Sequence, residues 1–297
     1  MSLLPSLSSL WRDPPPPLAF ELSEAGIAMA RTGKNPEFDF RPLDPGIVSV
    51  SPLRDNILEP EKFASAVRTL VPQNGGRRRR NAALILPDAC ARVWVLDFDN
   101  FPSDAKEQLS LVQFRMKKSV PYDVESAALS YYAQEPAGKK KKYDVVVAVA
   151  PMEIVSRYEA PFRALAIEPG FVTTSALAAL DLVNETGTLA VAKLSGRMLT
   201  ILVMSSGVLK LVRSLELSDP GLVEIAADLY PTLVYIEDQL GAKAEKLLLA
   251  GFGRFGAEAR DQFTRELLLP VELIHARVGV AGDHNLGLLG YLQSFIA

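Results

Sequence analysis

The stretch TLAVAKLSGRMLTILVMSSGVLKLVRSLEL, residues 188–217, decides the fold. Its apolar runs are separated by Ser195-Gly196 and by Ser205-Ser206-Gly207, and glycine-containing turns between such runs are typical of β-hairpins. We therefore predict three strands joined by two turns. The apolar-periodic segment that follows, residues 221–240, predicts one long helix.

The first half of the chain has the same order of elements. Residues 18–22 and 26–31 predict a β-hairpin, and GIVSVSPL, residues 46–53, alternates as a third strand. A helix is expected from Pro60, because proline fits the first turn of a helix and apolar residues follow at helical spacing. A unit that occurs twice predicts an α/β protein of duplicated architecture, with a cleft between its halves.

Additional elements separate the two units. Residues 91–102 predict a strand, and Ser103 is expected to cap a helix that ends near Lys118. A buried strand precedes a helix over residues 152–166, which Pro161 is expected to kink or interrupt. We therefore divide the chain into an N-terminal peptide and proline spacer (residues 1–17), a first core subdomain (18–92), an inserted subdomain (93–168), a return to the first core (169–186) and a second core subdomain (187–297).

The composition excludes several classes of protein. The chain has 297 residues, 48% of them hydrophobic, and a net charge of −3, which argues against a general nucleic-acid binder. A single cysteine, Cys90, excludes an internal disulfide framework and indicates a reducing compartment. Two histidines are too few for a metal cluster. No apolar run is long enough to span a bilayer. We expect a soluble, cytoplasmic protein with no metal and no cofactor.

Three stretches carry a family resemblance. They are ARVWVLDFDNFPSDAKEQLSLVQFRMKKSVPYDVESAALSYYAQ, residues 91–134, VVVAVAPMEIVSRYEAPFRALAIEPGFVTTSALAAL, residues 145–180, and KLLLAGFGRFGAEARDQFTRELLLPVELI, residues 246–274. They resemble the PilM family, cytoplasmic actin-like proteins of type IV pilus assembly that are related to the division protein FtsA. The resemblance implies a duplicated actin-like (ribonuclease H-like) architecture with an inserted FtsA-type subdomain.

The phosphate-binding motifs of that family are altered in this chain. The first motif, Asp-x-Gly, is matched by Glu21 and Ser23, and the second by Lys193-Leu194-Ser195. A lysine cannot hold Mg²⁺, which binds oxygen ligands. Serine side chains also crowd the close approach of backbone amides to phosphate that glycine permits.

The adenosine motif and the nucleotide lid are altered too. The family's Gly-Gly-Gly becomes Gly251-Phe252-Gly253, and we expect the ring of Phe252 to lie where adenosine would pass. Residues 217–246 leave room for one helix, so the helical lid of the family is expected to be reduced or missing. The sequence thus predicts a degenerate nucleotide site with no catalytic residue, and no enzyme.

The resemblance implies a scaffold function. Such a protein would bind the cytoplasmic tail of a PilN-like inner-membrane protein and reach the inner-membrane face only through its partners. The tail is expected in a groove between the first core and the inserted subdomain, at Phe114, Val120, Pro121 and Tyr122. Ordinary packing of the inserted subdomain is an equally good interpretation of each of these four residues.

Two alternatives stay open. One is an actin-like ATPase with a deviant site. The other is the cytoplasmic L-type component of a type II secretion system, which normally continues into a transmembrane helix, whereas this chain ends without one. Self-association and contact with a pilus motor ATPase are also open. Residues 1–13, with their Leu-Leu-Pro sequence, resemble a partner tail held on a proline spacer; a passive leader is the alternative.

Overall fold

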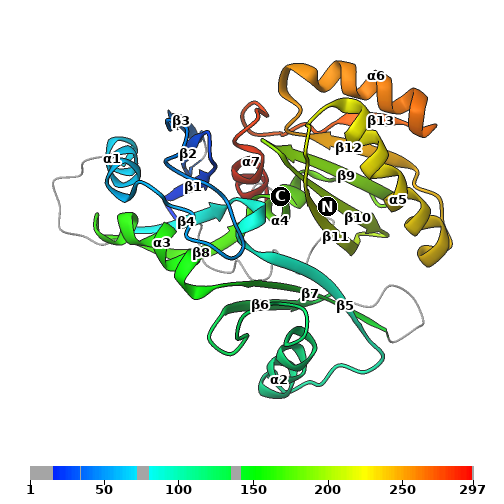
Figure 1. Cartoon of the computed structure of the whole chain (residues 1–297), viewed down its shortest axis with the longest axis horizontal. Coiled ribbons are helices and arrows are strands. Elements are labelled where there is room, and N and C mark those ends of the chain that lie inside the picture. Colours follow the sequence, from blue (N-terminus) through cyan, green and yellow to red (C-terminus); the bar gives the residue numbers. More distant parts are fainter. Residues whose placement is uncertain (1–15, 34, 72–79, 135–141, 296–297) are drawn as a thin grey trace.

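The computed structural model describes residues 16–33, 35–71, 80–134 and 142–295. Its strands form two five-stranded sheets and one three-stranded sheet. Figure 1 shows the two larger sheets side by side and the smaller sheet below them. Residues 1–13 lie outside the described residues, so the prediction about the Leu-Leu-Pro segment stays a prediction.

The first half is a mixed sheet in the order β3-β2-β1-β4-β8. The strands are β1 (Leu18–Leu22), β2 (Gly26–Arg31), β3 (Glu37–Pro42), β4 (Arg80–Leu86) and β8 (Ile167–Thr174). Helices α1 (Pro60–Leu70) and α3 (Met152–Arg163) share a core with one face of this sheet. The other face carries Ala19, Ala28, Ala30 and Ala83, whose small side chains let helices pack closely against the sheet.

The second half repeats this topology in the order β11-β10-β9-β12-β13. The strands are β9 (Thr188–Ser195), β10 (Met198–Ser205), β11 (Val208–Glu216), β12 (Lys246–Ala250) and β13 (Val271–Leu273). Helices α5 (Leu222–Leu240) and α6 (Gly256–Leu267) share the core on one face. The matching strand orders confirm the predicted duplication. Residues 217–246 are all described, and α5 is the one helix among them, as expected.

Two short helices join the halves. Helix α4 (Ser175–Ala179) and helix α7 (Leu286–Gln293) pack against each other. Leu286 and Leu289 of α7 share a core with β9 and β10, whereas Leu288 and Leu292 share one with β1 and β4. Figure 1 shows α7 between the two sheets. The last helix therefore belongs to both halves, not to the second core alone as predicted.

The inserted subdomain is a three-stranded antiparallel sheet with one helix. Its order is β5-β7-β6, from β5 (Arg92–Phe98), β6 (Ala128–Ala133) and β7 (Tyr143–Ala150). Helix α2 (Ala105–Met116) buries Val112 and Met116 against one face. The N-cap of α2 is Asp104, not Ser103 as predicted: its carboxylate accepts from the amides of Lys106 and Glu107.

The predicted boundary of the inserted subdomain at residue 168 is wrong. Helix α3 follows directly after β7, but its Tyr158 and Phe162 are fully buried in the core of the first half. The ring centroids of Phe162 and Phe20 lie 4.8 Å apart. The inserted subdomain thus ends with β7 at Ala150, because the apolar face of α3 matches the first sheet. Pro161 does not interrupt this helix, which continues to Arg163.

The predicted third strand of the first half is also wrong. Residues 46–53 form no strand, and Val48 makes only an isolated bridge to Ile57. The strand is β3, which pairs antiparallel with β2. Every residue of β3 is exposed, so burial contributes no hydrophobic signal there. Among the described residues, no helix is long and apolar enough to cross a membrane.

Candidate functional site

Glu21 lies at the predicted first phosphate position, near the end of β1, and is only 4% exposed. One carboxylate oxygen accepts from the hydroxyl of Ser175, and the other accepts from the amide of Leu288 at 2.7 Å. That amide is in the first turn of α7, where backbone N–H groups have no partner within the helix. Burial raises the pKa of Glu21, although Lys193 and these hydrogen bonds act in the opposite direction.

Lys193 lies at the predicted second phosphate position, near the end of β9, the middle strand of the second sheet. Its ammonium lies 2.8 Å from Oδ2 of Asp88, and the two side chains are 5% and 4% exposed. Oδ1 of Asp88 accepts from the amide of Ala176 at 2.6 Å, at the start of α4. The hydroxyl of Thr200 donates to Oδ2 at 3.3 Å. We call Glu21, Asp88, Ser175, Lys193 and Thr200 the interdomain polar cluster.

The polar groups of this cluster find their hydrogen-bond and ionic partners within the protein. Each oxygen of Glu21 and of Asp88 already accepts a hydrogen bond, and the charge of Lys193 is paired. A buried ion is tolerated only when it is paired in this way. The arrangement holds two halves of the chain together. Among the described residues, no group of three or more His, Cys, Asp or Glu could hold a metal ion.

The two serines of the altered phosphate motifs do not join this cluster. The hydroxyl of Ser23 donates to the carbonyl of Gly26 at 2.9 Å and accepts from its amide at 3.1 Å, which closes the β1–β2 hairpin. Ser195 ends β9 and leads into the turn at Gly196, whose φ is +59°. Both serines are therefore turn residues.

The glycine turn after β12 has a structural role. A Cβ on Gly251 would lie 2.1 Å from the carbonyl oxygen of Leu194, and φ of Gly251 is +76°. Gly253 also has a positive φ, of +46°. Contrary to the prediction, the ring of Phe252 does not lie in the crevice between the halves: it is buried in the second core, 6.0 Å from the ring of Phe263.

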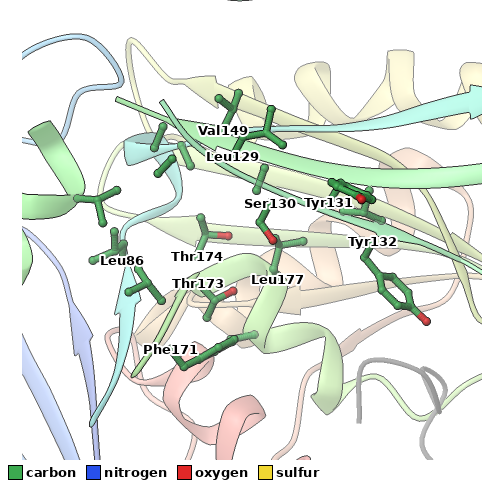
Figure 2. Close-up of a pocket in the computed structure, with 18 of the residues that line it drawn as sticks. Leu86, Leu129, Ser130, Tyr131, Tyr132, Val149, Phe171, Thr173, Thr174 and Leu177 are labelled. Carbon is green, nitrogen blue, oxygen red and sulfur yellow. The ribbon is translucent and has the colours of Figure 1, made fainter. Parts of the chain in front are cut away.

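A second feature is an apolar groove of about 560 Å³ between the inserted subdomain and the first half. One side is lined by β6 and β7, and the other by the end of β8 and by α4. Figure 2 shows Phe171, Thr173 and Thr174 of β8 opposite Leu129 and Ser130 of β6. Small residues such as Ala128, Ala148 and Ala178 leave the space open.

Two edge strands face this groove. β6 is at one edge of its sheet, and β8 is at one edge of the first sheet. An edge strand presents backbone N–H and C=O groups that an extended peptide can pair with. An apolar trough beside strand edges has the chemistry of a peptide-binding site.

The four residues predicted for the groove do not line it. Phe114 is 74% exposed on the outside of α2, and Val120 is buried in the core of the inserted subdomain. Pro121 is exposed, and the hydroxyl of Tyr122 donates to the carbonyl of Val149 at 3.3 Å. The prediction of these residues is wrong because they pack on the α2 side of the small sheet, whereas the groove lies at its edge.

Asp181 is the one charged side chain among the described residues that line the groove. It lies in the turn that follows α4, and its carbonyl accepts from the side chain of Gln293 at 2.9 Å. Burial raises the pKa of its carboxyl to about 7. No hydrogen bond or ion pair involves this carboxyl within the described part of the chain.

Sequence reasoning missed Asp88, Ser175 and Asp181. One signal was available for Asp88: an acid just after a buried parallel strand lies at the edge where such strands end together. Its neighbour Cys90 is buried beside Asn56 and Tyr158, and burial raises the pKa of the Cys90 thiol to about 12. Cys90 is therefore a core residue and not a nucleophile.

No protein-family model and no curated protein matches the chain. Solved structures do. The PilM-PilN type IV pilus biogenesis complex matches with a TM-score of 0.75 and 18% identity, over 93% of this chain and 98% of that chain. A protein of Bacteroides thetaiotaomicron with an actin-like ATPase fold and unknown function has a TM-score of 0.55 and 12% identity, over 93% and 94% of the two chains. The cytoplasmic domain of EpsL, an inner-membrane component of the type II secretion system of Vibrio cholerae, has a TM-score of 0.50 and 13% identity, over 94% of each chain.

The repeated sheets, the inserted subdomain and these likenesses identify the fold of this chain as the actin-like fold, as in PilM.

Proposed function

We propose that this protein is a non-catalytic scaffold of type IV pilus assembly that acts at the cytoplasmic face of the inner membrane. It binds the cytoplasmic tail of a PilN-like membrane protein in the apolar groove between β6 and β8. The observation that carries this proposal is the groove itself, an apolar trough of about 560 Å³ between two edge strands. The likeness to the PilM-PilN complex supports the choice of partner.

The groove favours an extended peptide over a helix. β-Augmentation gives affinity through main-chain hydrogen bonds, and pockets for alternate side chains give specificity. Val172 and Thr174 on β8, and Leu129 and Ser130 on β6, offer both kinds of contact. An apolar tail gains free energy from burial there, at about 25 cal/mol per Å² of apolar surface.

The interdomain polar cluster supports a non-catalytic role. An actin-like ATPase needs carboxylate oxygens for Mg²⁺ and amides for phosphate. Here the carboxylates of Glu21 and Asp88 are already bonded inside the protein, and Lys193 provides the cation. A nucleotide bound between the two halves of an actin-like ATPase would link them. In this protein the ion pair of Lys193 and Asp88 links the two halves instead.

A groove-filling substitution tests the proposal. The probe is a fluorescein-labelled peptide of the cytoplasmic tail of the PilN-like protein from the same genome. Ser130 is exposed and lines the groove, so Ser130→Trp fills the trough without removing core packing. Ser119→Trp is the matched control, because Ser119 is also exposed but does not line the groove.

We expect the wild type and Ser119→Trp to bind the peptide with equal Kd by fluorescence anisotropy, and Ser130→Trp to bind at least tenfold more weakly. Equal binding by all three proteins would place the tail elsewhere. If the wild type does not bind the peptide at 100 μM protein, the proposal that the PilN-like tail is the ligand is wrong.

A further inference from the structure

We propose that the groove is specific for an apolar extended peptide that carries one basic residue, lysine or arginine, and that Asp181 is the residue that selects it. This inference rests on the proposed function, because it concerns the ligand of the same groove. It adds the chemistry of the bound segment and names one residue of the scaffold as the determinant.

The lining of the groove makes the case for a single charge. The other lining residues are apolar or neutral, so a ligand with several charges would leave some of them buried without partners. A wholly apolar ligand would bury the carboxyl of Asp181 without a hydrogen-bond or ionic partner, because no cation is paired with it within the described residues. One basic side chain satisfies both conditions.

The position of Asp181 makes it a fixed determinant. It follows α4 directly and lies in a short 3₁₀ helix from Leu180 to Leu182. The side-chain amide of Gln293, in α7, donates to its carbonyl. Leu180 and Leu182 are buried in the core between the halves. The carboxyl is thus held in a turn that is packed into the core, and a polar group in a fixed position discriminates against ligands that leave it without a partner.

Two basic residues, Arg277 and Lys210, adjoin residues that contact Asp181 or line the groove, and both have other contacts. Arg277 donates from its guanidinium to the side chain of Asn184 at 3.4 Å. Lys210, in β11, is paired with Asp144 at 2.5 Å. A basic residue on the ligand would supply the cation that Asp181 lacks among the described residues. A charge-assisted hydrogen bond of this kind is stronger than one between neutral groups.

A peptide library tests the inference without knowledge of the natural partner. A phage-displayed library of random 12-residue peptides is selected on four immobilised full-length proteins: the wild type, Asp181→Asn, Ser130→Trp and Glu125→Gln. Glu125 is an exposed acid outside the groove, so its substitution is the matched control for loss of one negative charge. Sequencing of the enriched pools gives the frequency of lysine and arginine at each position.

We expect the wild type and Glu125→Gln to enrich apolar peptides with lysine or arginine at one fixed position. Asp181→Asn should enrich apolar peptides with no basic preference, and Ser130→Trp should lose both. On the wild type, replacing the basic residue of a selected peptide by glutamine should weaken binding about tenfold, which is about 1.4 kcal/mol. That last measurement needs no protein variant, so it holds even if Asp181→Asn folds poorly.

Two outcomes separate the inference from the function on which it rests. If the wild type enriches Ser130-dependent apolar peptides without a basic position, the inference is wrong and the peptide groove stands. If the wild type enriches nothing that Ser130→Trp does not also enrich, the groove binds no peptide and both fail.

Discussion

The ammonium of Lys193 and the carboxylate of Asp88 form an ion pair of 2.8 Å between the two halves of the chain, and both side chains are almost completely buried. Asp88 comes just after the β4 strand, and Lys193 comes from β9. Each half contributes one member of the pair. The stability of their arrangement therefore depends on two side chains that are 105 residues apart in sequence.

Removal of Lys193 should destabilise the protein strongly. In Lys193→Met the carboxylate of Asp88 stays buried without its cation, and breaking a buried pair costs about 3–5 kcal/mol. Urea unfolding followed by circular dichroism measures the loss. Arg31→Met is the control, because Arg31 and Glu37 form an exposed pair that contributes at most about 1 kcal/mol.

The double variant Lys193→Met, Asp88→Asn should be more stable than Lys193→Met alone. The substitution at Asp88 removes the unpaired charge, and the oxygen of the new side-chain amide can still accept from Ala176. Additive losses for the two substitutions would show that the pair has no coupling energy and would contradict its role as a link.

Mg²⁺ and ATP should not stabilise the protein. The carboxylates near the predicted phosphate positions are occupied by hydrogen bonds from Ser175, Leu288 and Lys193. A ligand present at 100 times its Kd adds about 2.7 kcal/mol to the free energy of unfolding. We expect no change of Tm with 5 mM ATP and Mg²⁺, with ATP plus EDTA as the control. A Kd below about 100 μM by calorimetry would instead restore the ATPase alternative.

Asp181 should make stability fall with rising pH. The pKa of its carboxyl is about 7 in the folded protein, against 3.8 for an unperturbed aspartate, so the folded state retains a proton that the unfolded state releases. The penalty is absent below pH 3.8, grows up to about pH 7 and then stays constant. A tenfold difference in proton affinity between the folded and unfolded states is worth about 1.4 kcal/mol, so the full penalty reaches about 4 kcal/mol.

Asp181→Asn tests this dependence. The variant should be more stable than the wild type at pH 8, and the difference should shrink at pH 5, as measured by chemical unfolding at both values. Glu125→Gln should show no such change. A constant difference between Asp181→Asn and the wild type at pH 5 and pH 8 would show that the carboxyl ionises normally.

Phe114→Ser should leave both stability and tail binding unchanged. Phe114 is largely exposed on α2 and does not line the groove, so its loss removes little packing. Surface substitutions of this kind usually change stability by less than about 0.5 kcal/mol. The anisotropy assay with the tail peptide measures binding. A tenfold loss of affinity would show that the tail binds at the α2 face and not in the groove.

Sequence periodicity predicted the elements that are buried, because burial on one face produces the periodic signal. The hairpin of β1 and β2, the meander of β9 to β11 and the long helix α5 are examples. Strand β3 was missed, since all of its residues are exposed and give no burial pattern. It is a strand because its backbone pairs with β2, and such pairing leaves no signal in the sequence of β3. Helix α3 was assigned to the inserted subdomain and not to the first half, because amphipathicity shows that one face of a helix is buried but not which sheet covers that face.

The candidate sites show a similar limit. The family motifs led to Glu21 and Lys193, which the structure brings into one cluster, but their partners Asp88 and Ser175 come from other parts of the chain. The groove residues could not be found from local pattern. Ala128, Ser130 and Ala148 line it because they are small, and small residues in a strand carry no distinctive signal.

The contact between Glu21 and α7 has a consequence for biosynthesis. The amide of Leu288 that bonds this carboxylate is 267 residues later in the chain. At about 5–20 residues per second, a ribosome needs roughly 15–50 s to reach it after Glu21 is made. During that time the alanine face of the first sheet is without α7, and its apolar surface is exposed to chaperones and to other nascent chains. The first half is made early but completed last.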